Sequence, residues 1–178
     1  LQQGSPDSGM PSSYRYLETL VEMVNNKKTN PEAKLFWHMT WAYQSNSTHS
    51  GFANYGKDQM TMYNAIVNSV QTKVVPSGYF SKVIPNGTAV QNMRTSFVGD
   101  NLTRDGYHMS YDIGRYLTAL GYAKALTGRD LDKVTYIPSG YTYSKNAILA
   151  MKDAVNKACA TPYAVTASAY PPDPEFDL

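Results

Sequence analysis

The sequence has few of the features that mark membrane, nucleic-acid-binding or disulfide-bonded proteins. Its one cysteine, Cys159, excludes an internal disulfide and leaves the redox compartment undecided. No apolar run approaches the roughly 18 residues that a membrane span requires. Lysine and arginine gather no further than the pair Lys27–Lys28, and the formal net charge is only +2. Because nucleic-acid binding needs a basic face, the composition does not favour that function.

The composition indicates one domain with a substantial hydrophobic core. The chain has 178 residues, of which 42% are hydrophobic, and 15 are tyrosines. Amphipathic aromatic side chains of this kind suit sugars and other polar small molecules. We place the domain at residues 1–160. The proline-rich residues 161–178 are expected to form a tail that is extended on the surface or partly disordered.

Apolar periodicity and turn signals predict alternating helices and strands. A continuous apolar run predicts a strand buried on both faces at 34–43, and a shorter strand is predicted at 82–85. Helical spacing predicts five helices, which begin at Ser12 or Ser13 and run to 27, then span 58–74, 86–93, 110–126 and 144–159. This alternation is typical of an α/β layered domain with a parallel sheet. Ligands of such domains bind beyond the carboxyl ends of the strands, which favours the polar loops 44–56 and 99–109.

The stretch "LTRDGYHMSYDIGRY" places Asp105 and His108 three residues apart in a polar turn. An aspartate that accepts a hydrogen bond from histidine Nδ1 leaves Nε2 free to act as a general base. We therefore expect an Asp105 oxygen within hydrogen-bond distance of His108 Nδ1, with Nε2 facing a cleft. The alternative is that the two side chains only satisfy free amides near the helix predicted to begin at Ser110.

Several sequence blocks resemble the SGNH hydrolases, the superfamily of GDSL-type esterases and lipases. The segment "DGYHMSYDIGRYLTALGYAKALTG" resembles their last block, in which an Asp-Xaa-Xaa-His turn precedes the final helix. The opening "QQGSPDSG" is similar to their third block, at the end of a central strand. The segment "WHMTWAYQ" resembles a secreted bacterial branch described only as a domain of unknown function. The resemblance extends over most of residues 1–128.

The resemblance implies a three-layer α/β/α sandwich of flavodoxin-like type with a parallel sheet. It further implies ester hydrolysis without a cofactor, with His108 activating a serine, Asp105 orienting the imidazole, and acyl groups on carbohydrates as substrates. A periplasmic or extracellular location follows from the same resemblance. The nucleophile block of the family, Gly-Asn/Asp-Ser, does not occur in the expected place and would precede Leu1. We therefore expect that the N-terminal part of the domain is missing and that an upstream fragment is the partner of this chain.

The opening residues and the end of the first predicted strand supply the other candidate site residues. Ser5 or Ser8 could be the nucleophile, but only "LQQ" precedes them where a strand is required, and Pro6 lacks an amide for an oxyanion hole. We favour a role for Gln3, Gly4 and Ser5 at the border of the oxyanion site. The other substrate-binding candidates are Tyr43 and Gln44.

Two further interpretations stay open. The histidines His38, His49 and His108 lack the spacing of metal-ligand pairs, so no metal site is predicted. We expect His38 to be buried in its strand with its ring hydrogen-bonded, and His49 to be exposed to solvent. The rival to an esterase is a non-catalytic carbohydrate-binding module on the same fold.

Overall fold

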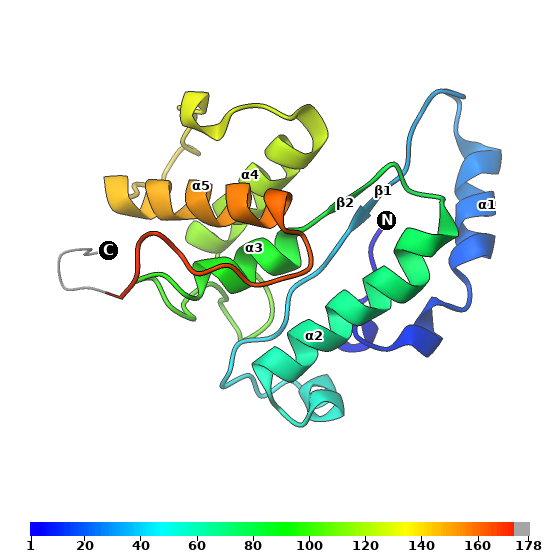
Figure 1. Cartoon of the computed structure of the whole chain (residues 1–178), viewed down its shortest axis with the longest axis horizontal. Helices are drawn as coiled ribbons and strands as arrows, with labels where there is room; N and C mark the ends of the chain where they lie inside the picture. The colour runs from blue at the N-terminus through cyan, green and yellow to red at the C-terminus, as the bar shows by residue number, and fades with distance from the viewer. Residues whose placement is uncertain (173–178) are drawn as a thin grey trace.

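The computed structural model of the chain describes residues 1–172, and about half of the residues are helical. The α-helices are α1 (Leu17–Lys27), α2 (Gln59–Ser69), α3 (Asn86–Met93), α4 (Ile113–Thr127) and α5 (Lys145–Ala160). Two short strands, β1 (Phe36–His38) and β2 (Lys82–Ile84), pair in parallel with Trp37 opposite Val83. In Figure 1, α3, α4 and α5 pack together on one side of the strands, and α1 and α2 lie on the other side. The protein is therefore a mixed α/β structure with a small parallel sheet.

The predicted strand 34–43 is buried as expected but is much shorter than predicted. Its strand geometry ends at His38, while residues 39, 42 and 43 remain fully buried. The reason is that α3 begins directly after β2, so no further strand lies beside residues 39–43. Met39 instead donates its amide to Ile84 and accepts one from Gly87, at the first turn of α3. On the other side of β1, Leu1 donates its amino group to Phe36 and accepts the His38 amide.

Two hydrophobic cores lie on either side of the paired strands β1 and β2. One core joins α3, α4 and α5 through residues such as Met93, Leu117 and Met151. The other joins α2 to β1 and the N-terminal segment through Trp37, Phe52 and Ile66. The polar loop 44–56 connects β1 to α2 within the second core, and the loop 99–109 connects α3 to α4 within the first.

Helix starts were predicted well where a side chain caps the first turn. The Asp58 carboxylate accepts the Thr61 amide at 2.6 Å, and Ser144 Oγ accepts the Ala147 amide at 3.1 Å. Gly128, with φ of 67°, ends α4 as predicted. The starts predicted at Ser110 and at Ser12 or Ser13 were wrong, because α4 begins at Ile113 and a separate 3₁₀ turn at Pro11–Tyr14 precedes α1.

The described part of the tail is extended and held to the helices by hydrogen bonds. The Thr166 amide donates to Asn92 Oδ1 at 2.7 Å, and the Ser168 amide donates to Thr95 Oγ1 at 2.7 Å. Tyr170 adds its carbonyl oxygen as acceptor for the Phe97 amide at 3.0 Å. Residues 161–170 are therefore bound against α3. The part of the predicted tail at 173–178 lies outside the described residues.

Candidate functional site

The Asp105–His108 turn is a closed loop of the backbone. An antiparallel bridge pairs Thr103 with Met109, and the Arg104 amide donates to the His108 carbonyl at 3.0 Å. Gly106 has a φ of 90°, a conformation that residues with a Cβ rarely adopt. This tight closure turns the Asp105 and His108 side chains to the same side, as the spacing predicted.

Asp105 makes two kinds of hydrogen bond within the turn. Its Oδ2 lies 2.6 Å from His108 Nδ1, which confirms the predicted contact. Its Oδ1 accepts the amides of Tyr107, at 3.2 Å, and of His108, at 2.8 Å. The alternative reading from the sequence was therefore right in part, because the same carboxylate also satisfies backbone amides. One oxygen fixes the turn and the other orients the imidazole.

The carboxylate is held in its charged form. Desolvation alone would raise the pKa of Asp105, but the hydrogen bonds from the His108 ring and from the two amides outweigh it and lower this pKa to about 2. A charged Asp105 requires a proton on His108 Nδ1, so Nε2 of the neutral ring is a free acceptor. The His108 side chain is 52% exposed, so its ring faces open surface rather than an enclosed pocket.

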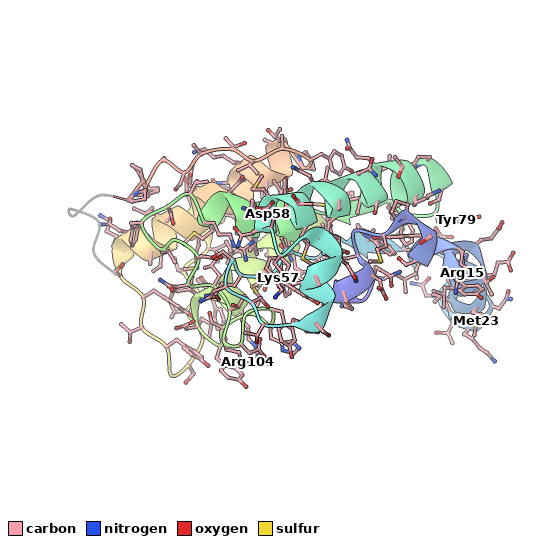
Figure 2. All side chains as sticks on the ribbon, turned by 90° about the horizontal axis from the view of Figure 1, so that it is seen from below. Arg15, Met23, Lys57, Asp58, Tyr79 and Arg104 are labelled. Carbon is pink, nitrogen blue, oxygen red and sulfur yellow. The ribbon has the colours of Figure 1, made fainter. Side chains whose placement is uncertain are left out.

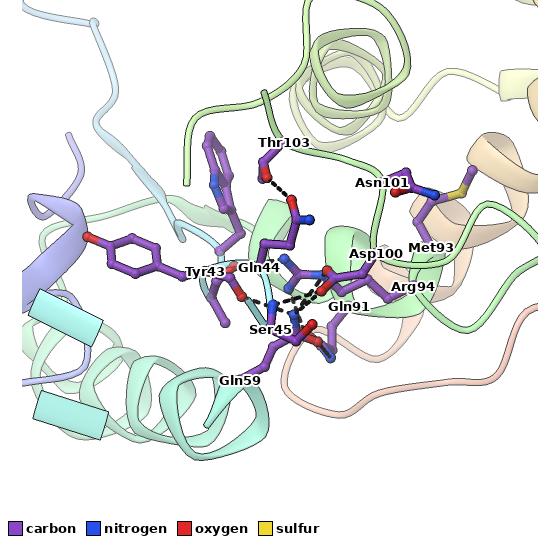
Figure 3. Close-up of polar contacts among 12 residues, drawn as sticks. Tyr43, Gln44, Ser45, Gln59, Gln91, Met93, Arg94, Asp100, Asn101 and Thr103 are labelled. Carbon is purple, nitrogen blue, oxygen red and sulfur yellow. Dashed lines mark hydrogen bonds and ion pairs between the residues drawn. The ribbon is translucent and has the colours of Figure 1, made fainter. Parts of the chain in front are cut away.

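Residues 41–44, which follow β1, support the turn through hydrogen bonds. Trp41 Nε1 donates to the Tyr107 carbonyl at 2.8 Å, and the Gln44 amide donates to the Gly106 carbonyl at 2.8 Å. The Gln44 side chain accepts a short hydrogen bond from the Thr103 hydroxyl (Figure 3). The Gln44 side chain therefore positions the turn, and its role in substrate binding stays a prediction.

A buried polar network around Arg94 and Asp100 holds residues 42–45 in place. The Arg94 side chain is 4% exposed, and its guanidinium donates to Asp100, Gln91 and the carbonyl of Ala42 at distances of 2.7–3.0 Å. Gln59 donates to both Asp100 oxygens, and the Ser45 amide donates to Asp100 Oδ2 at 2.7 Å. Figure 3 shows these bonds converging on the Asp100 carboxylate. The network ties α2 and α3 to both polar loops, and no local pattern in the sequence predicts it.

Ser5 and Tyr43 lie in one continuous cluster with His108. Ser5 Oγ is 2.9 Å from the Tyr43 hydroxyl. The Tyr43 ring contacts the Tyr107 ring at 5.6 Å between centroids, and Tyr107 contacts the His108 ring at 4.2 Å. Tyr43 is fully buried, and burial raises its pKa against the opposing effect of the Ser5 hydrogen bond, so its hydroxyl keeps its proton. Residues far apart in the sequence thus meet at one place, as the fold class predicted for these loops.

Gln3 and Gly4 form hydrogen bonds within the N-terminal segment and are not part of this cluster. Gln3 Nε2 donates to the Ser13 hydroxyl at 2.7 Å and to the Ser13 carbonyl at 3.0 Å. Gln3 Oε1 accepts the Gly4 amide at 2.8 Å, which occupies the donor that an oxyanion site would use. Ser8 is also committed, since it is 1% exposed and its hydroxyl donates to the Ser5 carbonyl at 2.8 Å. Of the opening residues, only Ser5 has its side chain in the cluster with His108.

His49 belongs to this cluster too, and our expectation that it is exposed to solvent was wrong. Its ring is half-buried against Tyr43 and Tyr107, with centroid distances of 4.9 Å and 4.7 Å. His49 Nδ1 accepts the Gly51 amide at 3.0 Å. The sequence contained one clue, because His49 sits in the polar loop that follows β1.

His38 is a structural histidine, as predicted. Its Nδ1 lies 2.7 Å from Gln2 Oε1, and its Nε2 lies 3.1 Å from Asn86 Nδ2. Burial lowers the pKa of His38 to about 4. A ring bonded at both nitrogens and only 7% exposed has no free position for a ligand.

Within residues 1–172, no three His, Cys, Asp or Glu side chains gather in a way that would hold a metal ion. The same residues include no helix that combines the length and the apolar character of a membrane span.

Comparison with known proteins shows the family. Residues 1–158 match the model of a domain of unknown function, DUF4886, so the chain belongs to the DUF4886 family. It is similar to the crystal structure of a DUF4886 family protein from Bacteroides uniformis, with 41% sequence identity and a TM-score of 0.85. The match covers 93% of this chain but 62% of that one, so the chain spans less than two thirds of its solved relative. No curated protein matches.

Proposed function

We propose that the whole protein is an SGNH-type serine hydrolase that cleaves ester bonds, and that Asp105 and His108 are two members of its triad. The observation that carries this proposal is the 2.6 Å contact between Asp105 Oδ2 and His108 Nδ1, on a histidine side chain that is 52% exposed. On this proposal the helices on both sides of β1 and β2 are part of a three-layer α/β/α sandwich of the flavodoxin-like type.

The proton transfers follow from the tautomer that Asp105 fixes. A serine hydroxyl attacks the acyl carbonyl carbon, and His108 Nε2 takes its proton. The imidazolium that forms is stabilised by the charged Asp105 and returns the proton to the leaving alcohol. In the second half, water donates a proton to Nε2 as it attacks the acyl-enzyme. The serine is then released by taking that proton back.

We place the nucleophilic serine outside these 178 residues. The resemblance to SGNH hydrolases implies that it lies in a Gly-Asn/Asp-Ser block that precedes Leu1 in a longer protein. Ser5 is the second candidate because it shares the cluster with His108. Against Ser5, its hydroxyl is held by Tyr43, and two aromatic rings connect it to the imidazole. A nucleophile has to approach the general base to hydrogen-bond distance.

The substrates that we propose are O-acyl, chiefly acetyl, esters of carbohydrates, and the proposed location is periplasmic or extracellular. Both rest on the resemblance described above. The chemistry needs no cofactor, because an activated serine and a general base suffice.

The test uses the longer protein, which includes the segment upstream of Leu1, with p-nitrophenyl acetate as substrate. Asp105→Asn keeps an oxygen for the two backbone amides but presents an amide to Nδ1, so it disfavours the working tautomer. We expect kcat to fall by about 10³–10⁴-fold for this variant and for His108→Gln.

Asp130→Asn is the matched control. Asp130 is exposed and also accepts a backbone amide two residues on, at 3.0 Å, but no histidine contacts it. We expect its activity to equal that of the wild type. Hydrolysis by the wild type that survives in His108→Gln would reject the proposed triad. No hydrolysis of any short acyl ester by the longer protein would favour the non-catalytic carbohydrate-binding module.

A further inference from the structure

A groove of about 380 Å³ lies between α4 and the connection to α5. Its floor is one face of α4, where Ala119 and Ala123 leave room beside Leu120. Its outer wall is the irregular segment 134–143, which includes Pro138. The volume is that of a ligand pocket for a small molecule rather than of a gap in packing.

Tyrosines dominate the lining of this groove. Tyr116, Tyr143 and Tyr141 stack in a row, with interplanar angles of 10° and 11° between successive rings. At the rim, Tyr136 is 69% exposed and Tyr111 is 55% exposed. Aromatic faces with polar hydroxyl edges match a sugar ring, which presents C–H groups on its faces and hydroxyls around its edge.

One end of the groove is positively charged. The Arg115 guanidinium lies 4.4 Å from the centroid of the Tyr111 ring, and the Arg104 guanidinium lies 4.8 Å from it. Within residues 1–172 no carboxylate comes within ion-pair distance of Arg115. A guanidinium held flat on an aromatic ring keeps its donors free for a carboxylate, which it binds through two parallel hydrogen bonds.

The charged end of the groove adjoins the Asp105–His108 turn. Arg104 Nε is 3.9 Å from Asp105 Oδ2, the same oxygen that contacts His108. Arg104 therefore contacts the dyad on one side and Tyr111 on the other. It stands at the edge of the molecule in Figure 2. Tyr111 and Arg104 thus connect the groove to the Asp105–His108 turn.

We propose that the groove formed by Tyr111, Arg115, Tyr136 and Tyr141 binds a carboxylate-bearing oligosaccharide. Sugar rings stack on the tyrosines, and the sugar carboxylate pairs with Arg115. The oligosaccharide is the substrate of the esterase only if the proposed function holds, so this part of the proposal rests on it. Binding in the groove itself requires only the residues named here.

The binding test uses the longer protein and isothermal titration calorimetry. The probe is a xylo-oligosaccharide that carries a glucuronic acid branch, and its matched control is the same oligosaccharide without the branch. We expect saturable binding of the acidic probe and at least about 10-fold weaker binding of the neutral one, because a hydrogen bond between charged groups is lost. Equal affinity for the two, or no binding of either, would overturn the proposal.

Variants locate the binding in the groove. We expect Arg115→Gln to weaken binding of the acidic probe by about 10-fold, and Tyr136→Ala to weaken it by roughly 3–10-fold. The control pair is Arg15→Gln and Tyr16→Ala. Arg15 also lies over an exposed tyrosine ring, at 4.9 Å, but this pair is far from Arg104 in the molecule (Figure 2). Unchanged affinity in the groove variants, or an equal loss in the control pair, would reject the assignment.

The two proposals fail separately. Binding of the acidic probe, which carries no ester, involves no bond cleavage, so its absence contradicts the groove alone. Hydrolysis of p-nitrophenyl acetate by the longer protein needs no oligosaccharide, so its absence contradicts the triad alone. His108→Gln should leave the affinity for the probe within about 2-fold, since the imidazole is not one of the groove residues.

Discussion

The backbone of Gly106 lies directly against Ser47. A Cβ added at Gly106 would come within 2.9 Å of Ser47 Oγ and 3.1 Å of Ser47 Cα. This contact joins the two polar loops at the residue between Asp105 and His108 that gives the turn its shape. The close approach and the φ of 90° both require glycine at this position.

Gly106→Ala should therefore destabilise the protein and displace the turn. The left-handed conformation alone costs about 1–2 kcal/mol for a residue with a Cβ, and the contact with Ser47 adds to it. We expect a loss of at least about 2 kcal/mol in the free energy of unfolding, measured by urea denaturation. Gly140→Ala is the control, because Gly140 has a φ of 83° but open space around it. Equal losses in the two variants would show that the contact with Ser47 is unimportant.

Arg94 provides the second prediction. Arg94→Met removes the only cation of the buried network and leaves Asp100 with Gln59 and the Ser45 amide as partners. Removing one partner of a buried ion pair costs about 3–5 kcal/mol, and we expect the free energy of unfolding to fall by that amount. Lys157→Met, which breaks the more exposed pair with Asp153, should cost about 1 kcal/mol or less. Comparable losses would mean that the network contributes no more than a surface pair.

The sequence predicted the Asp105–His108 contact because everything that forms it lies within a few residues. The spacing, Gly106 and the turn signals are all local. The contacts that hold the turn in place come from Trp41 and Gln44, about 60 residues earlier in the chain. Side chains that meet only after folding leave no periodic pattern in one sequence, so this support could not be foreseen.

Apolar patterns predicted burial better than they predicted backbone geometry. Met39 and Tyr43 are fully buried, but the strand ends at His38, because strand geometry depends on a partner and β2 ends at Ile84. The apolar positions of the predicted helices also include more residues than the structure buries. Leu20 and Met60 lie at the apolar spacing of their helices but are 49% and 41% exposed, since the packing neighbours of a helix set the width of its buried face.

The last prediction concerns His38 and pH. Its pKa is about 4 in the folded protein, compared with 6.5 for a free histidine, because burial disfavours the charged ring. Between these two values the unfolded chain binds more protons than the folded protein, so the free energy of unfolding rises with pH. The contribution of a neutral His38 is complete above pH 6.5 and is lost as the pH falls toward 4. The difference corresponds to roughly 3 kcal/mol.

His38→Gln removes this titration while leaving the other ionisable groups in place. We expect urea denaturation of the wild type to show a steep fall in stability between pH 6.5 and 4, and the variant to show a fall smaller by up to roughly 3 kcal/mol. At pH 7 the variant is itself less stable, because a glutamine cannot reach both Gln2 and Asn86 as the ring does. The decisive quantity is therefore the slope with pH and not the stability at one pH. Parallel curves for the two proteins would show that His38 takes up a proton as readily in the folded protein as in the unfolded chain.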